Sequence, residues 1–271
     1  MALISVRFWG VRGSIPAPGF ATVGFGGNTS CVEVRAGDDV VILDMGSGLR
    51  MLGESMGRAP AKASLFLSHY HWDHIQGLPF FGPAYNPASA LDIYGPVREG
   101  RDVRSILSGQ MVAPYFPVTL EAFRARIGFH TVADGQTIRI GATRVTASEL
   151  NHPNGVLAYR VEHEGKAVVY ATDTEHGTAA DRALVALAHD AEALIYDSMY
   201  TDDEYTGSKT GWGHSTWSAG LQIVQKAGAK RLVLFHHEPT RTDRDLEALW
   251  NTVKGQGGTA LMAREGETLE F

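Results

Sequence analysis

The chain has 271 residues, of which 44% are hydrophobic and 20% charged, and this composition excludes a disordered or fibrous protein and allows a sizeable core. Its formal net charge of -6 disfavours a long polynucleotide ligand, because non-specific binding to a phosphate backbone relies on a basic surface. With one cysteine, Cys31, and no apolar run of the length that a membrane span requires, we expect a cytoplasmic protein without disulfides, secretion signal or membrane anchor.

Short β-type runs, separated by glycine-rich or proline-bearing turns, fill the first part of the chain. They cover residues 3–9, 31–35, 40–44 and 64–68. Residues 98–126 are mixed and partly helical, with interruptions at Pro114 and Pro117. Further strands are predicted at residues 127–132, 136–140 and 144–148. This half is therefore predicted to form a sheet with loops at its edges.

The second half combines strands with helices. Its strands are predicted at residues 156–162, 166–171, 193–196 and 231–235, the first two as a hairpin. Its helices are predicted at residues 178–189, 215–227 and 243–254, and two short strands flank Glu265-Gly266. Because no repeat or long linker divides the chain, we expect one domain over residues 1–271. Its fold class is α/β, a four-layer αββα sandwich of two sheets with helices outside.

A histidine-rich motif follows the apolar run at residues 65–67. It occupies residues 68–74 and spells Ser-His-Tyr-His-Trp-Asp-His. His69 and His71 can point to one metal ion, and Asp73 and His74, after the chain turns, can face a second. These side chains would cost much desolvation free energy if left unpaired, whereas coordination satisfies all of them. Nitrogen and oxygen ligands without sulfur suit zinc, and they also accept manganese or iron.

The pattern His-x-His-x-Asp-His resembles the metallo-β-lactamase superfamily of binuclear hydrolases. Further elements of that family follow strand candidates in the expected order, at Asp44, His152, Asp173 and His236. The resemblance implies a first metal ion held by His69, His71, His152 and Asp173. It implies a second held by Asp73, His74, Asp173 and His236, so that Asp173 bridges the two. It also implies that Asp44 orients a ligand imidazole; the alternative is a simple turn residue.

The number of ligand groups supports two ions independently of that resemblance. Five imidazoles and two carboxylates are more than one four-coordinate zinc ion uses, whereas two ions that share a carboxylate use them all. A water between two such ions would lose a proton near neutral pH, and the ions would polarise the electrophile. We therefore expect two divalent ions per chain, Zn²⁺ first, with Mn²⁺ or Fe²⁺ as alternatives.

A second motif, Gly213-His214-Ser215-Thr216, opens a predicted helix. It resembles the phosphodiesterase branch of the superfamily, which includes ribonuclease Z and cyclic-phosphate phosphodiesterases. The resemblance implies that His214 donates a proton, assisted by Asp197 at the end of a strand, where the family more often has glutamate. An alkoxide is a poor leaving group, so such a donor would contribute about 10²–10⁴-fold to the rate. The alternative is that His214 only begins a helix beside Ser215 as the N-cap.

These features predict a binuclear hydrolase of a small phosphodiester, such as a cyclic nucleotide, with His214, Asp197 and Asp73 as catalytic residues. Ribonuclease Z grips transfer RNA with a basic arm, and because the chain has no comparable insertion, structured RNA is disfavoured as a partner. The alternative enzyme is a lactone or other acyl ester hydrolase. A non-catalytic metal-dependent binding protein is less favoured, because all seven ligand positions are filled. The resemblance also implies a homodimer.

Two glycine-rich segments, residues 9–16 and 24–30, are candidates for contact with a substrate phosphate. Backbone amides in such turns can hold phosphate, and Arg12 can neutralise its charge, with Ser14 and Asn28 beside it. Residues 207–213 form a candidate flap ahead of His214. Its Trp212 is predicted to stack on a base, with hydrophobic anchoring of the flap as the alternative.

Overall fold

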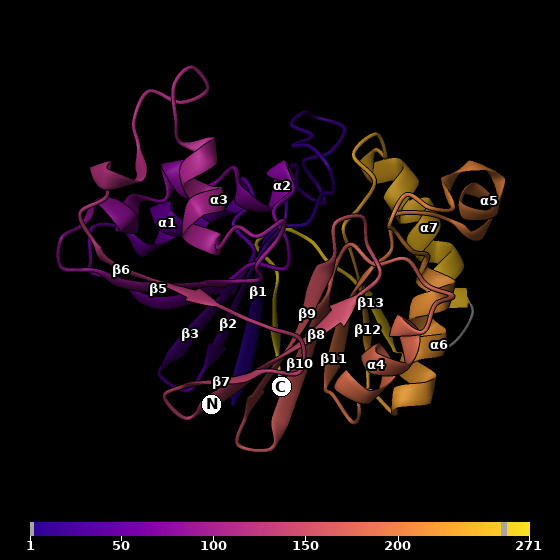
Figure 1. Ribbon diagram of the computed structural model, residues 1–271. Coiled ribbons are helices and arrows are strands. Elements are labelled where there is room, and N and C mark those ends of the chain that lie inside the picture. The colour runs from indigo at the N-terminus through magenta and orange to yellow at the C-terminus, as the bar shows by residue number, and fades with distance from the viewer. Residues whose placement is uncertain (1–2, 256–258) are drawn as a thin grey trace.

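Two sheets of seven strands each pack face to face in the computed structural model, with helices on their outer faces (Figure 1). The structure describes residues 3–255 and 259–271. In Figure 1 strands β1 to β6 and helices α1 to α3 run from indigo to magenta, and the second sheet and helices α4, α6 and α7 run from rose to yellow. The sheets are the inner layers of four, so the predicted αββα sandwich is confirmed.

The first sheet has the strand order β14-β1-β2-β3-β4-β5-β6. Its strands are β1 (Ile4–Gly10), β2 (Cys31–Ala36), β3 (Asp39–Leu43), β4 (Lys62–Phe66), β5 (Ala90–Gly95), β6 (Arg126–Thr131) and β14 (Thr268–Glu270). The helices beside it are α1 (Gly48–Met56), α2 (Trp72–Ile75) and α3 (Val103–Gln110). Sequence reasoning missed α1 and β5.

The second sheet has the strand order β13-β12-β11-β10-β9-β8-β7. Its strands are β7 (Thr137–Ile140), β8 (Thr143–Leu150), β9 (Val156–His163), β10 (Lys166–Ala171), β11 (Ala193–Asp197), β12 (Leu232–Phe235) and β13 (Ala260–Met262). The helices of this half are α4 (Ala180–Leu187), the short α5 (Asp202–Glu204), α6 (Trp217–Ala227) and α7 (Asp243–Gly255). The two short strands around Glu265-Gly266 therefore belong to different sheets.

Alternation along the central strands explains the layering. In β11, Ile195 packs in the cluster between the two sheets, whereas Leu194 and Tyr196 pack in the cluster under the helices. The same alternation separates Leu43, between the sheets, from Ile42, under α1 and its neighbours. Strands that are apolar on both faces suit inner layers, because side chains of successive residues point to opposite faces.

The α6 helix begins later than predicted. Its N-cap is Thr216, whose side chain accepts from the amide of Ala219. Ser215 lies outside the helix, and its hydroxyl pairs with the hydroxyl of Tyr196 at 2.8 Å. The alternative in which Ser215 caps the helix is therefore wrong. At the other end Gly228 adopts a left-handed conformation with φ 67°, as its predicted role requires.

Parallel strands bring the polar residues of both sheets to one end of the sandwich. β3 runs parallel to β4, and β10, β11 and β12 are parallel to one another. Asp44, Asp173 and His236 each follow such a strand and adopt left-handed backbone conformations, with φ of 62°, 49° and 60°. Because carboxyl ends of parallel strands meet at one edge of a sheet, these sharp turns gather side chains from distant parts of the chain.

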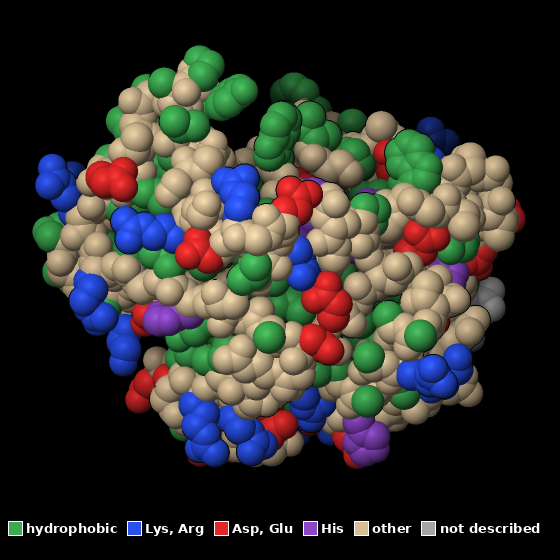
Figure 2. Space-filling view, in the orientation of Figure 1, with side chains coloured by type: hydrophobic (Ala, Val, Ile, Leu, Met, Phe, Trp, Pro, Cys, Tyr) green, Lys and Arg blue, Asp and Glu red, His purple; other side chains and the backbone are tan. Residues whose placement is uncertain are grey.

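Exposed apolar side chains line one rim of the molecule. Figure 2 shows hydrophobic side chains along the upper rim, where Figure 1 places the loops that connect strands and helices. The most exposed large hydrophobic residues are Phe20, Val23, Trp72 and Tyr115. In the part of the chain that the structure describes, no helix is long and apolar enough to cross a membrane.

Candidate metal centre

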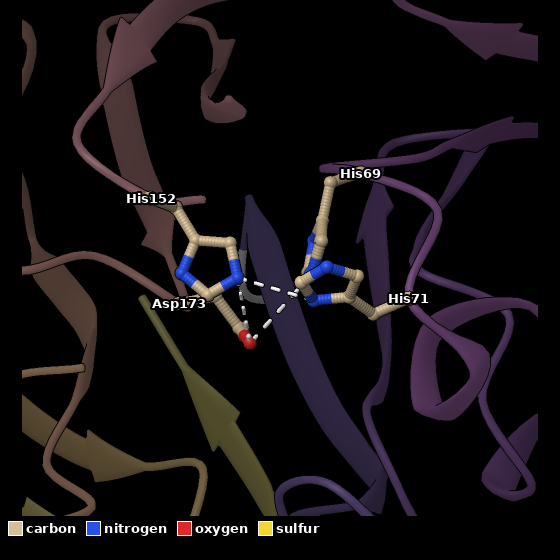
Figure 3. A group of neighbouring side chains, drawn as sticks. All are labelled: His69, His71, His152 and Asp173. Carbon is tan, nitrogen blue, oxygen red and sulfur yellow. Dashed lines mark hydrogen bonds and ion pairs between the residues drawn. The ribbon is translucent and has the colours of Figure 1, made fainter. Parts of the chain in front are cut away.

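Three groups of ligand-type side chains meet at the strand ends: two of them share Asp173, and the third contains Asp197, His214 and His236. The first contains His69, His71, His152 and Asp173. The second contains Asp73, His74, Asp173 and His236. Within each group, one nitrogen or oxygen atom of every side chain lies within 4.8 Å of the others. In Figure 3 the first group draws two side chains from each half of the molecule, all pointing inward. The structure thus brings together all seven residues singled out from the sequence.

Asp173 stands between the two groups. Its Oδ2 atom lies 3.7 Å from Nε2 of His69 and 4.0 Å from Nε2 of His152. Its Oδ1 atom lies 3.2 Å from Nε2 of His74 and 3.1 Å from Nε2 of His236. One carboxylate oxygen therefore faces each group, which is the arrangement that a shared ligand needs.

The electrostatics of the second group fit a cation. Burial by itself would lower the pKa of His74, but the carboxylates of Asp73, Asp173 and Asp44 raise this pKa well above its usual value. Nε2 of His69 and Nε2 of His74 are buried and have no hydrogen-bond partner among the described residues. Buried carboxylates that face unpartnered imidazole nitrogens form a donor set that divalent ions satisfy.

The histidines of the first group are held in the form that binds metal. Burial lowers the pKa of His69, His71 and His152, and it outweighs the carboxylate of Asp173, which raises the pKa of each. All three rings are therefore neutral near pH 7. Since a neutral imidazole offers a lone pair and a protonated one does not, the first group is ready to accept an ion without releasing protons.

Hydrogen bonds to the outer ring nitrogens orient the histidines. His74 donates through Nδ1 to Asp44 at 2.7 Å, and His152 donates through Nδ1 to the carbonyl of Gly213 at 2.7 Å. Asp44 also accepts the hydroxyl of Tyr170 at 2.7 Å and the amide and hydroxyl of Ser68, each at 2.8 Å. These bonds turn Nε2 toward the centre. Asp44 thus contacts a candidate ligand, as the resemblance implies, and is fully buried.

Asp44→Asn is expected to destabilise the metal-free protein. The amide would set an N–H₂ group against donors that the carboxylate now accepts, and each buried group left without a partner costs about 1–3 kcal/mol. We expect the free energy of unfolding to fall by at least about 2 kcal/mol, measured by urea denaturation in the presence of a chelator. An unchanged free energy of unfolding would show that these four bonds contribute no net stability.

His214 and Asp197 form a buried ion pair beside the two groups. Nδ1 of His214 lies 2.8 Å from Oδ2 of Asp197, and Oδ1 of Asp197 accepts the amide of Met199 at 3.0 Å. Burial would lower the pKa of His214, but Asp197 raises it to about 9. Nδ1 of His214 is also 4.0 Å from Oδ2 of Asp173. A protonated imidazole is therefore held next to the candidate metal ligands.

A cavity of about 400 Å³ opens onto these residues. Its lining residues are Ser14, Tyr70, His71, Trp72, Asp73, Asp173 and His214. The backbone amide of Ser14 donates to Oδ2 of Asp73 at 2.8 Å. Sequence reasoning missed Tyr70 and Trp72, although both occupy the variable positions of the His-x-His-x-Asp-His motif and therefore had to lie beside its ligands.

The prediction that Arg12 contacts substrate is wrong. Its side chain is fully buried and donates to the carbonyls of Gly26 at 2.8 Å, Arg241 at 2.7 Å and Glu238 at 3.2 Å. The guanidinium joins loops that are far apart in the sequence, and no part of it reaches solvent. A lone arginine in a glycine-rich loop gives no sequence signal that separates this structural role from phosphate binding.

Arg12→Met is therefore expected to lower stability rather than substrate affinity. Methionine fills much of the space but leaves three carbonyls without their donor, so we expect a loss of about 1–3 kcal/mol in the free energy of unfolding. Urea denaturation measures this loss, and steady-state kinetics below the melting temperature should give an unchanged KM. A large rise in KM with unchanged stability would restore the phosphate-binding interpretation.

The other substrate candidates differ in placement. The amide of Asn28 donates to Glu265 at 3.0 Å and accepts the hydroxyl of Ser47 at 3.0 Å, so this side chain binds the protein's own loops and is absent from the cavity lining given above. Trp212 is 58% exposed, and Nζ of Lys209 lies 4.0 Å from its ring centroid. Its predicted stacking on a base stays a prediction.

The fold and the two convergent groups together define a metal-dependent hydrolase of the metallo-β-lactamase type. A family model of the β-lactamase superfamily domain matches residues 42–237, and the chain belongs to that family. The chain is 26% identical to ribonuclease Z of Natronomonas pharaonis over an alignment that covers 99% of this chain and 98% of that protein.

Two crystal structures share the whole fold. The metallo-β-lactamase fold protein YhfI from Bacillus subtilis aligns over 100% of both chains, with a TM-score of 0.74 and 22% identity. A diphosphatase from the PhnP family aligns over 99% of this chain and 98% of its own, with a TM-score of 0.73 and 18% identity. At this level of identity the structural likeness establishes the fold, and the chemistry must be argued from the site.

Proposed function

We propose that the chain is a binuclear metallohydrolase that cleaves a phosphodiester, with His214 as the proton donor to the leaving oxygen. The observation that carries this proposal is the buried His214–Asp197 pair beside two histidine and aspartate groups. Two divalent ions in those groups would supply a strong nucleophile at neutral pH and neutralise charge on the phosphate. A thioester needs such a donor less, because a thiolate leaves more readily than an alkoxide.

Each residue has a defined role in this proposal. Asp173 would hold both ions, because its two oxygens face different groups. Asp73 would hold the second ion, and the amide of Ser14 orients its carboxylate. Asp197 keeps His214 charged, since it raises the pKa of that imidazole to about 9. His214 then transfers its proton as the bond to the leaving oxygen breaks.

A phosphodiester of modest size, such as a cyclic nucleotide, is the substrate that we propose. The cavity of about 400 Å³ falls within the range of about 300–1,000 Å³ in which proteins bind small molecules. The net charge of -6 disfavours a long polynucleotide, because binding to its phosphate backbone relies on a basic surface. The name ribonuclease Z gives RNA as the substrate of that relative, so a structured RNA belongs among the compounds tested. The homodimer expected from the resemblance stays a prediction, which sedimentation at micromolar concentration would check.

A substrate panel tests the proposal. Protein loaded with zinc or with manganese would be assayed on cyclic nucleotides, a dinucleotide, a precursor transfer RNA, a lactone and a thioester under identical conditions. Asp173→Ala protein, purified in the same way, controls for contaminating hydrolases. Preferential cleavage of the phosphodiesters is the expected result. Turnover of the lactone or thioester with no phosphodiester cleavage would support the acyl ester hydrolase instead, and no turnover by protein that retains both ions would support a binding protein.

A further inference from the structure

Glu175 lies on the loop after β10, two residues beyond Asp173, and its side chain is buried. Its Oε1 atom accepts the hydroxyl of Tyr205 at 2.9 Å and the amide of Gly211 at 2.7 Å. Its Oε2 atom accepts the amide of Gly213 at 3.0 Å. One carboxylate therefore binds both ends of residues 205–213, a segment that contains the candidate flap at residues 207–213.

The segment that Glu175 holds reaches the first metal group. The carbonyl of Gly213 accepts Nδ1 of His152 at 2.7 Å. Gly213 has φ +83°, and a Cβ atom there would lie 2.3 Å from the same Nδ1 atom. Only glycine therefore allows this close approach. The backbone amide of Glu175 also donates to the carbonyl of Asn151, the residue before His152, at 2.8 Å.

Through these bonds Glu175 can orient His152, a candidate metal ligand that it does not bind itself. The carbonyl of Gly213 keeps the proton of His152 on Nδ1, so that Nε2 faces Asp173 as a lone-pair donor. The position of that carbonyl depends in turn on the amide of the same residue, which Glu175 binds. Glutamine has the same size but only one acceptor atom, so its amide N–H₂ group would meet an N–H group of the loop.

We propose that Glu175 is a positioning residue that sets the affinity of the first group for its metal ion, acting through Gly213 and His152. The inference rests on the proposed metal centre. It goes beyond that proposal because it links residues 205–213, which carry Trp212 and precede His214, to one of the two groups and not to the other. Among the described residues, the hydrogen-bond partners of the Glu175 side chain are Tyr205, Gly211 and Gly213, and none of these belongs to the second group. Asp173, which belongs to both groups, is two residues before Glu175 in the chain.

Cobalt(II) titration of the metal-free protein, followed by its visible absorption and by calorimetry, separates the two groups. Glu175→Gln is expected to weaken binding to one of the two sites by at least about tenfold, the range found for residues that orient metal ligands, while the other site keeps its affinity. Glu192→Gln is the matched control. Glu192 is similarly buried, at 8% exposure, and pairs with Lys166 at 2.6 Å and Lys230 at 2.8 Å, away from the metal groups.

Amide hydrogen exchange of the metal-free variants gives a second reading. Faster exchange at Gly211 and Gly213 is expected in Glu175→Gln and not in Glu192→Gln, because the carboxylate is the acceptor of both amides. If Glu175→Gln does not fold, Tyr205→Phe serves in the titration, since it removes one of the three bonds and keeps the ring. A weakening of one site by about threefold or more is then expected.

Separate outcomes overturn separate claims. Wild-type affinity at both sites in folded Glu175→Gln, or in Tyr205→Phe where that variant is used, would overturn the positioning role. Equal weakening of both sites would also overturn it, because it would show a general structural effect. Failure of the wild-type protein to bind cobalt at all would instead overturn the proposed metal centre.

Discussion

Replacing His214 by alanine is expected to lower kcat by about 10²–10⁴-fold on a diester with an alkoxide leaving group. The same change should affect a p-nitrophenyl diester only slightly, because nitrophenolate leaves without a proton. This contrast follows from a donor that acts on the leaving oxygen rather than from a role in binding. Steady-state kinetics on a matched pair of substrates measures it.

The control for this prediction is metal content. His214 lies outside the two groups proposed to hold the ions, so His214→Ala protein should retain wild-type metal content. Asp197→Asn should show the same dependence on leaving group with a smaller loss, since the imidazole remains but its partner no longer carries charge. Equal losses on both substrates would reject His214 as the proton donor.

The pH dependence follows from the same ion pair. Asp197 raises the pKa of His214 to about 9 although burial opposes it, so the imidazole is protonated below that pH and loses its proton above it. Turnover of the alkoxide substrate should therefore fall as the pH rises through the pKa of His214. The pH–rate profile of His214→Ala should lack this descending limb, and its persistence there would assign the limb to another group.

Asp173→Ala is expected to abolish binding at both sites. Its Oδ2 faces the first group and its Oδ1 the second, so each site loses a ligand at once, and phosphodiesterase activity should fall to background. Atomic absorption after dialysis should give two ions per wild-type chain and none for the variant. Asp203→Ala, at an exposed position on α5, is the control. Retention of one ion would show that Asp173 is not shared.

Most of the secondary structure could be predicted from the sequence, because the strands are short, apolar and separated by clear turns. Thirteen predicted runs lie within a few residues of observed strands, and the helix ended by Gly228 was found by its terminating glycine. β5 was missed although residues 90–95 alternate in burial as a strand does, because they directly follow a loop with three prolines. α1 was missed because it begins among the glycines at residues 46–48.

Some features of the candidate site could likewise be predicted from the sequence, and others depend on tertiary contacts. The spacing of residues 69–74 is a local property, so the sequence alone pointed to a metal centre and, through its resemblance, to a family. The shared position of Asp173, the burial of Arg12 and the bonds of Glu175 depend on residues far apart in the chain. Glu175 lies in a short loop without any motif of its own, and its three partners are 30 to 38 residues away.

The sequence by itself determined the class of chemistry, since residue types at fixed spacing define which ligands and proton donors are available. Only the tertiary structure decided which charges face a substrate and which face the protein. Arg12 and Asp44 show the difference, because both are charged residues within two positions of a glycine and both are fully buried. Burial is set by the packing of two sheets whose strands come from opposite ends of the chain, and no local pattern contains that information.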